Sequence, residues 1–168
     1  MMIILDCDSV SILAKVNRFD ILDKAFPGAR FCITNSVYIE LLRAKRAGYS
    51  FPDMVFEYFP VIAMDREDLK AFQNISKQSM VHDGEAEGLS ICQEKNATFL
   101  TNDHQAIIFA ERYGINALDM KDLLTLLAIR QIQTYDEMIS LIEDIEIRDN
   151  TCVKYKDKIM ARYERNGL

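Results

Sequence analysis

The sequence predicts an α/β fold in which helices wrap a mostly parallel central sheet. Short apolar runs of strand-forming residues, among them Met2–Leu5 and Ala97–Thr101, alternate with longer segments whose apolar residues recur at helical spacing. The first run is apolar without interruption, as in strands that are buried on both faces. Strands that alternate with helices pair in parallel and carry the helices on the faces of the sheet.

Turn and capping residues divide the chain into these elements. The predicted strands are residues 2–5, 29–33, 59–64, 97–101 and 115–118. Helices are expected after Asp8 or Ser9, over 19–25, after one of the residues 34–36, over 65–77, from Glu85, from Asp103 to Gly114, after Asp119 and after Thr134. In the helix over 65–77, the side chains expected to face inward are Leu69, Phe72 and Ile75. The segment around Phe51 and Pro52 shows no clear pattern.

Length and composition point to one globular unit. The 168 residues, 49% of them hydrophobic, predict a single domain over 1–168 with a basic helix or tail at 151–168. No segment approaches the roughly 20 apolar residues of a membrane span, and MMIILDCD meets an acid too early for a signal peptide. The cysteines are widely spaced and form no Cys-x-x-Cys pair. A soluble, cytoplasmic protein with reduced thiols is therefore expected.

The charge of the chain limits its partners. A formal net charge of −6 argues against a general nucleic-acid binder, which usually has a basic face. It leaves room for a nuclease that holds divalent cations with carboxylates, because the metal neutralises their charge. The basic stretch 151–168 fits either a solvated helix that rests Val153, Ile159 and Met160 on the protein body or an arm that contacts RNA.

Four acidic residues are the candidates for chemistry. Asp6 and Asp103 each follow a predicted strand, at the edge where parallel α/β sheets bind ligands. Glu40 joins an apolar helix face, and Glu85 opens another helix. A carboxylate cluster without His or Cys suits hard cations such as Mg²⁺ or Mn²⁺, which activate water and clamp a phosphodiester. Phosphodiester hydrolysis is the expected chemistry.

Each of these acids also has a structural interpretation. Asp6 and Asp103 could cap the helices that follow them. Glu85 could stabilise the positive end of its helix, and Glu40 could be half exposed. Asp8 is well placed to cap the helix after the first strand. Convergence of two strand-end acids and two helix-borne acids on one sheet edge is more than capping requires.

Three segments resemble the ordered motifs of the PIN-domain nucleases, in particular their VapC-like branch. They are ILDCDSVSILAKVNRFDIL, ITNSVYIELL and GEAEGLSICQEKNATFLTND, within a resemblance that spans roughly residues 2–130. The resemblance implies a three-layer α/β/α sandwich, Mg²⁺- or Mn²⁺-dependent cleavage of RNA, a homodimer, and often a toxin that an antitoxin protein keeps silent. It assigns the four catalytic, metal-binding acids of the family to Asp6, Glu40, Glu85 and Asp103.

The resemblance also makes Asp8 and Thr101 the neighbours that support these ligands. Two residues depart from the pattern of the family. Position 8 is Asp where Ser or Asn is commoner, and position 102 is Asn where another Asp is frequent. These departures leave the number of metal ions open.

Two other functions compete with this one. Asp6-Cys7-Asp8 after an apolar strand also resembles the opening of haloacid-dehalogenase-like phosphatases, in which the first Asp attacks phosphorus. That assignment leaves Glu40 and Glu85 without a role. A catalytically silent PIN-like module that binds RNA or protein is the other alternative, and its melting temperature should show no saturable response to Mn²⁺.

Two finer expectations concern one site residue and assembly. Glu85 and Glu87 cannot easily enter one metal site, because residues two apart on a helix point about 200° from each other. The spacing to Asp103 matches the family for Glu85, so Glu87 is expected to pair with a base or meet solvent. Apolar helix surface also favours the homodimer, through Leu123, Leu124, Leu126 and Leu127.

Overall fold

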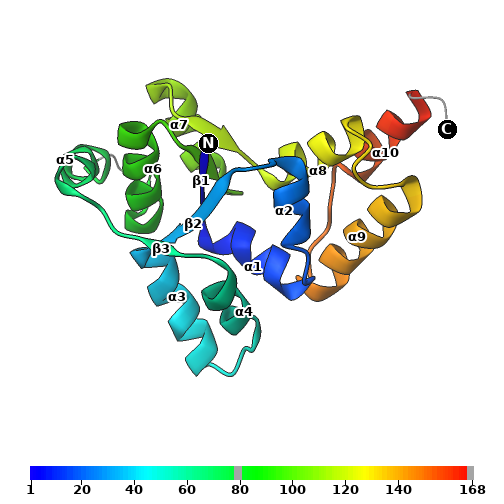
Figure 1. Cartoon of the computed structure of the whole chain (residues 1–168), viewed down its shortest axis with the longest axis horizontal. Helices are drawn as coiled ribbons and strands as arrows, with labels where there is room; N and C mark the ends of the chain where they lie inside the picture. Colours follow the sequence, from blue (N-terminus) through cyan, green and yellow to red (C-terminus); the bar gives the residue numbers. More distant parts are fainter. Residues whose placement is uncertain (78–80, 166–168) are drawn as a thin grey trace. The chain divides into compact units, whose positions relative to one another are not determined.

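The computed structural model describes residues 1–77 and 81–165. In this part of the chain five strands form one sheet in the order β3-β2-β1-β4-β5, and every neighbouring pair is parallel (Figure 1). The strands are β1 (Met2–Leu5), β2 (Arg30–Thr34), β3 (Val61–Ile62), β4 (Thr98–Leu100) and β5 (Asn116–Leu118). The predicted α/β fold with a parallel central sheet is confirmed.

Helices alternate with the strands and then complete the described chain. They are α1 (Cys7–Lys15), α2 (Asp20–Ala25), α3 (Asn35–Arg46), α4 (Phe51–Tyr58), α5 (Arg66–Ile75), α6 (Asp83–Lys95), α7 (His104–Tyr113), α8 (Met120–Ile129), α9 (Tyr135–Arg148) and α10 (Lys156–Arg165). The segment without a clear sequence pattern is α4, whose Pro52 lies in the first turn, where a missing N–H leaves no helical bond unmade. None of the described helices has the length and apolar character to cross a membrane.

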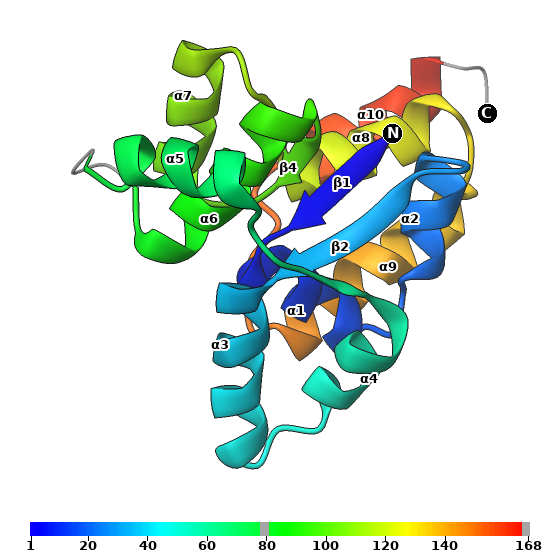
Figure 2. The same cartoon turned by 60° about the vertical axis from the view of Figure 1, so that its left-hand side comes forward.

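Strand register brings several polar residues to one edge of the sheet. Leu5 at the end of β1 lies opposite Ile33 of β2 and Leu100 of β4. The residues that follow these strands therefore meet at the carboxyl edge, and the Asp6 N–H donates to the Leu100 carbonyl at 3.0 Å. Figure 2 shows α1 and α3 beginning beyond the arrowheads of β1 and β2.

Helix α6 has a long buried segment. Its residues Ala86 to Cys92 are all buried, as is typical of a helix covered on every side. Gly88 makes this fit possible, because a Cβ there would lie 2.4 Å from the Phe99 ring of β4. The ring thus packs directly on the α6 backbone and sets how closely the helix approaches the sheet.

The chain divides into two compact units. The first holds Met1–Ser11 and Gly28–Asp119, and with them the whole sheet. The second holds Ile12–Pro27 and the chain from Met120 onward. Within the second unit α10 packs on α8 and α9, and the Tyr163 hydroxyl donates to the Gln133 carbonyl at 2.9 Å. Val153, Ile159 and Met160 are buried, as the solvated-helix interpretation of the basic stretch requires.

Three expectations from the sequence are wrong in their details. In α5, Leu69 is exposed and Asp68 is buried in its place, because Asp68 bonds the start of its own helix and Lys95. Asp8 lies inside α1 and does not cap it. The leucines expected to form a dimer surface are largely covered within the chain, since α8 buries Leu123, Leu124 and Leu127.

Candidate functional site

The four acids singled out in the sequence share one pocket of the first unit. Its volume is about 230 Å³. Its lining residues are Asp6, Cys7, Asp8, Val37, Glu40, His82, Gly84, Glu85 and Asp103. Carboxylates that follow β1, lie on α3 and α6, and cap α7 after β4 thus converge, and no lysine or arginine is among these lining residues.

Asp6 is the most enclosed of the four acids, with 8% of its surface exposed. Its Oδ1 accepts the Ser9 N–H at 2.7 Å, so Asp6 caps α1 as its structural interpretation supposed. Its Oδ2 accepts the hydroxyl of Thr101 and the Asn102 N–H, the latter at 3.3 Å. Burial raises the pKa of Asp6 and the nearby Asp8 adds to the rise, while the hydrogen bonds from Thr101 and Ser9 oppose it.

Thr101 joins two of the acids. Its hydroxyl donates to Asp6 and accepts the Asp103 N–H at 3.0 Å. Asp103 in turn caps α7, since its Oδ1 accepts the Ala106 N–H at 2.7 Å. The fully buried Thr101 therefore holds the two strand-end acids in a fixed relation to each other.

Glu85 enters the pocket from the first turn of α6. Its Oε2 accepts the His82 N–H at 2.7 Å, which ties the side chain to the start of its own helix. Burial raises the pKa of Glu85, and the negative charges of Asp103 and Asp6 raise it further against the opposing His82 bond. The charges of both strand-end acids therefore act on Glu85 in the direction that disfavours its ionised form.

Glu40 reaches the pocket from the second turn of α3. Thr34 caps this helix by accepting the Val37 N–H at 3.4 Å, and Glu40 itself is exposed. Its carboxylate is hydrogen-bonded to Cys7, whose thiol pKa is raised to about 12 by burial and by this neighbour. A Cβ on Gly84 would lie 3.5 Å from Glu40 Oε1, so α3 and the start of α6 are close here.

Comparison with known proteins agrees with this architecture. Residues 2–156 match a family model described as PIN domain. The chain belongs to the PIN domain family. A comparison with curated protein sequences gave no match.

Solved structures share the fold of this PIN domain at low sequence identity. VapBC-1 from nontypeable Haemophilus influenzae is similar at 16% identity and a TM-score of 0.56, over 71% of this chain and 98% of that one. A PilT N-terminus domain protein from Sulfolobus solfataricus P2 reaches 20% and 0.52, over 73% and 90%. VapBC2 from Rickettsia felis, bound to a DNA fragment from their promoter, reaches 13% and 0.55, over 71% and 98%.

The donors of the PIN-domain pocket suit a hard cation. Capping uses Oδ1 of Asp103 and Oε2 of Glu85, and no hydrogen bond of the described residues occupies their other carboxylate oxygens. Capping and ligation are therefore compatible in the same side chain. Among residues 1–77 and 81–165, no three His, Cys, Asp or Glu side chains already have the arrangement that would hold a metal ion.

Glu87 of the PIN domain has a role that the sequence reasoning missed. It neither pairs with a base nor meets solvent, because it is 2% exposed and its Oε2 accepts the Ser36 N–H of α3 at 2.8 Å. The available signal was the run of small residues Ala86, Gly88 and Ser90 around it, which is typical of a helix buried on all sides.

Proposed function

We propose that this PIN domain is a metal-dependent endoribonuclease that hydrolyses RNA phosphodiester bonds. The observation that carries the proposal is the pocket in which Asp6, Glu40, Glu85 and Asp103 meet without a lysine or arginine among the lining residues. The negative charges of Asp103 and Asp6 raise the pKa of Glu85 beyond the effect of its burial, and a divalent cation would relieve that repulsion.

The same four acids are the proposed ligands of Mg²⁺ or Mn²⁺. Such an ion supplies a water of lowered pKa and positive charge for the transferring phosphoryl group. The other residues of the chain hold these ligands in place. Thr101 holds Asp6 beside Asp103, the His82 N–H restrains Glu85, and Asp8 stands exposed at the pocket as a further acid.

The biological role that we propose is that of a toxin controlled by an antitoxin protein, in the cytoplasm. Its support is the VapC-like resemblance of the three motif segments, together with the similarity in fold to the VapBC proteins. A homodimer belongs to the same proposal. It rests on the family resemblance alone, since the leucines of α8 are largely buried within the chain.

The two alternatives are less well supported. A haloacid-dehalogenase-like phosphatase would use Asp6 as nucleophile, whereas membership of the PIN domain family and convergence of Glu40 and Glu85 on the same pocket favour a nuclease. A catalytically silent module would have no need for four converging acids.

The deciding experiment is cleavage of end-labelled RNA by the purified protein with Mn²⁺ and with Mg²⁺, beside the Asp6→Asn variant. We expect cleavage by the wild type with metal, none with a chelator, and none by the variant. Intact RNA under all conditions, together with a melting temperature that Mn²⁺ does not shift, would favour the silent module. A trapped aspartyl-phosphate on Asp6 would favour the phosphatase.

A further inference from the structure

We propose that Glu87 is a positioning residue. Its hydrogen bond to the start of α3 holds this helix against α6, so that Glu40 faces Glu85 across the pocket. This inference rests on the proposed function of the pocket and deepens it. Glu87 is not itself a lining residue of the pocket. It acts through the backbone of the helix that carries Glu40.

One hydrogen bond connects the two helices that bring acids to the pocket. Glu87 Oε2 accepts the N–H of Ser36 at 2.8 Å, between residues 51 positions apart in the sequence. Ser36 lies one helical turn before Glu40 on α3, and Glu87 lies two residues after Glu85 on α6. The bond therefore links the two helices that carry Glu40 and Glu85.

The start of α3 needs such an acceptor. The first N–H groups of a helix have no partner within it, and the Thr34 cap serves only the Val37 N–H, at 3.4 Å. Glu87 satisfies the Ser36 N–H, and its negative charge lies at the positive end of the α3 dipole. With Glu87 2% exposed, water cannot readily replace the bond if it is broken.

The helices are close enough at this point for a small shift to matter. A Cβ on Gly84 would lie 3.5 Å from Glu40 Oε1 and 3.8 Å from the Ser36 side chain. Movement of the first turn of α3 would therefore move Glu40 relative to Glu85 and Asp103. Supporting contacts of this kind hold ligands in place, and their loss weakens metal affinity without removing a ligand.

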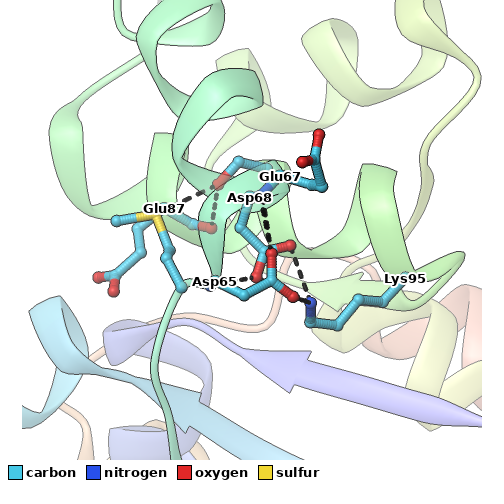
Figure 3. A network of polar contacts seen from close by, with 7 residues as sticks. Asp65, Glu67, Asp68, Glu87 and Lys95 are labelled. Carbon is cyan, nitrogen blue, oxygen red and sulfur yellow. Dashed lines mark hydrogen bonds and ion pairs between the residues drawn. The ribbon is translucent and has the colours of Figure 1, made fainter.

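Asp68 offers a matched control in the same unit. It too is a buried carboxylate that accepts a backbone N–H, that of Asp65 at 2.9 Å. In Figure 3 the Glu87 side chain points away from the group formed by Asp65, Asp68 and Lys95. Asp68 stabilises α5 and is not among the residues that line the pocket.

The test measures Mn²⁺ affinity, from the shift of melting temperature with Mn²⁺ concentration, for the full chain and three variants. Glu87→Met keeps much of the volume and removes the acceptor; we expect Mn²⁺ to bind about 10–100-fold more weakly. Glu87→Gln retains an amide oxygen for the Ser36 N–H and should stay within about threefold of the wild type. Asp68→Leu should lower the melting temperature without metal and leave Mn²⁺ affinity unchanged.

Amide hydrogen exchange provides a readout that does not need the metal. Glu87→Met should speed exchange in the first turn of α3, whereas Asp68→Leu should do so only around α5. A wild type that responds to Mn²⁺ while Glu87→Met responds equally overturns the positioning role alone. Equal losses in Glu87→Gln and Glu87→Met overturn the hydrogen-bond explanation. A wild type with no response to Mn²⁺ overturns the proposed function, and the role of Glu87 with it.

Discussion

Two groups of acidic residues in the first unit differ in whether a lysine side chain lies among them. Asp65 and Asp68 meet Lys95, whose Nζ lies 2.6 Å from Asp65 Oδ2 and 2.8 Å from Asp68 Oδ2 (Figure 3). Hydrogen bonds, first from Lys95 and then from the Asp68 and Glu67 N–H groups, lower the pKa of Asp65 to about 2. In the pocket, burial raises the pKa of Asp6 and of Glu85, and no lysine or arginine is among the lining residues.

The difference agrees with a structural role for the group around Lys95 and with the role proposed for the pocket. An acid whose charge is balanced by a fixed lysine has a completed electrostatic environment and serves to join α5 to α6. Asp6 and Glu85, whose pKa is raised by burial and by neighbouring negative charge, are costly to ionise, and a cation from solution would relieve that cost. The second arrangement should therefore lower the stability of the protein without metal, as is typical of functional sites.

The largest effect should follow from removing one charge in the pocket. Asp103→Asn is expected to abolish metal-dependent RNA cleavage, a loss of about 10²–10³-fold or more for an electrostatic contact to the reacting group. Asn is also a good N-cap, so α7 should form normally and the metal-free protein should be as stable or slightly more so. Undiminished cleavage by a pure, folded variant would remove Asp103 from the site.

A comparison of two glutamates of α6 distinguishes the proposed metal ligand, Glu85, from the proposed positioning residue, Glu87. Glu85→Gln keeps an oxygen for the His82 N–H and loses the charge, so cleavage should disappear while the fold remains. Glu87→Gln keeps an acceptor for Ser36 and should alter cleavage far less. Rates for both variants at saturating Mn²⁺ decide the matter, and the reverse ranking would show that the helix phase assigned to Glu85 is wrong.

The sequence predicts the strand-end acids better than it predicts what surrounds them. Asp6 and Asp103 each follow an apolar run, and parallel register then brings such residues to one edge. The Glu87 bond could not be foreseen, because its partner is a backbone N–H 51 residues away and every helix start offers such donors. The number of domains stays a prediction.

The error in α5 has a local cause. Apolar spacing favoured Leu69 as an inward residue, whereas the capping box of Asp65 and Asp68 and the pairing with Lys95 turn Asp68 inward. A buried carboxylate with fixed partners thus outweighs one exposed leucine. Hydrophobic periodicity alone cannot predict that Asp68 is buried instead of Leu69, since Lys95, which pairs with Asp68, lies on α6.

The close contact between Gly88 of α6 and the Phe99 ring of β4 gives a third prediction. Gly88→Ala should lower the free energy of unfolding by about 1–3 kcal/mol, because the new Cβ meets the buried Phe99 ring at 2.4 Å. Any outward shift of α6 would also carry Glu85, so Mn²⁺ affinity should fall as well. Urea unfolding with and without Mn²⁺ measures both effects, and unchanged stability would contradict the packing seen between α6 and β4.

The smallest expected effect comes from removing Lys95, the positive charge that pairs with Asp65 and Asp68. Lys95→Met should cost about 1–2 kcal/mol, since the fully buried Asp68 loses a charged partner whose own side chain is 26% exposed and partly screened by water. Mn²⁺ affinity should not change, because none of these residues lines the pocket. Lys70→Met, which breaks a pair with 59% of both side chains exposed, serves as the matched control and should have almost no effect.

The pH dependence of the stability lost in Lys95→Met distinguishes an ion pair from simple packing. The lowered pKa of Asp65 makes its contribution complete above its unfolded value of about 3.9, and lost as the pH falls toward about 2. The raised pKa of Lys95 makes its contribution complete below its unfolded value of about 10.4, and lost only as the pH rises through the folded value. The stability difference between wild type and Lys95→Met should therefore be constant from about pH 5 to 9 and shrink below pH 4. Melting temperatures across this range provide the measurement. A difference that persists undiminished at pH 2.5 would mean that the Lys95 stem contributes through packing, and the contrast between a neutralised and an uncompensated group of acids would then lose its electrostatic basis.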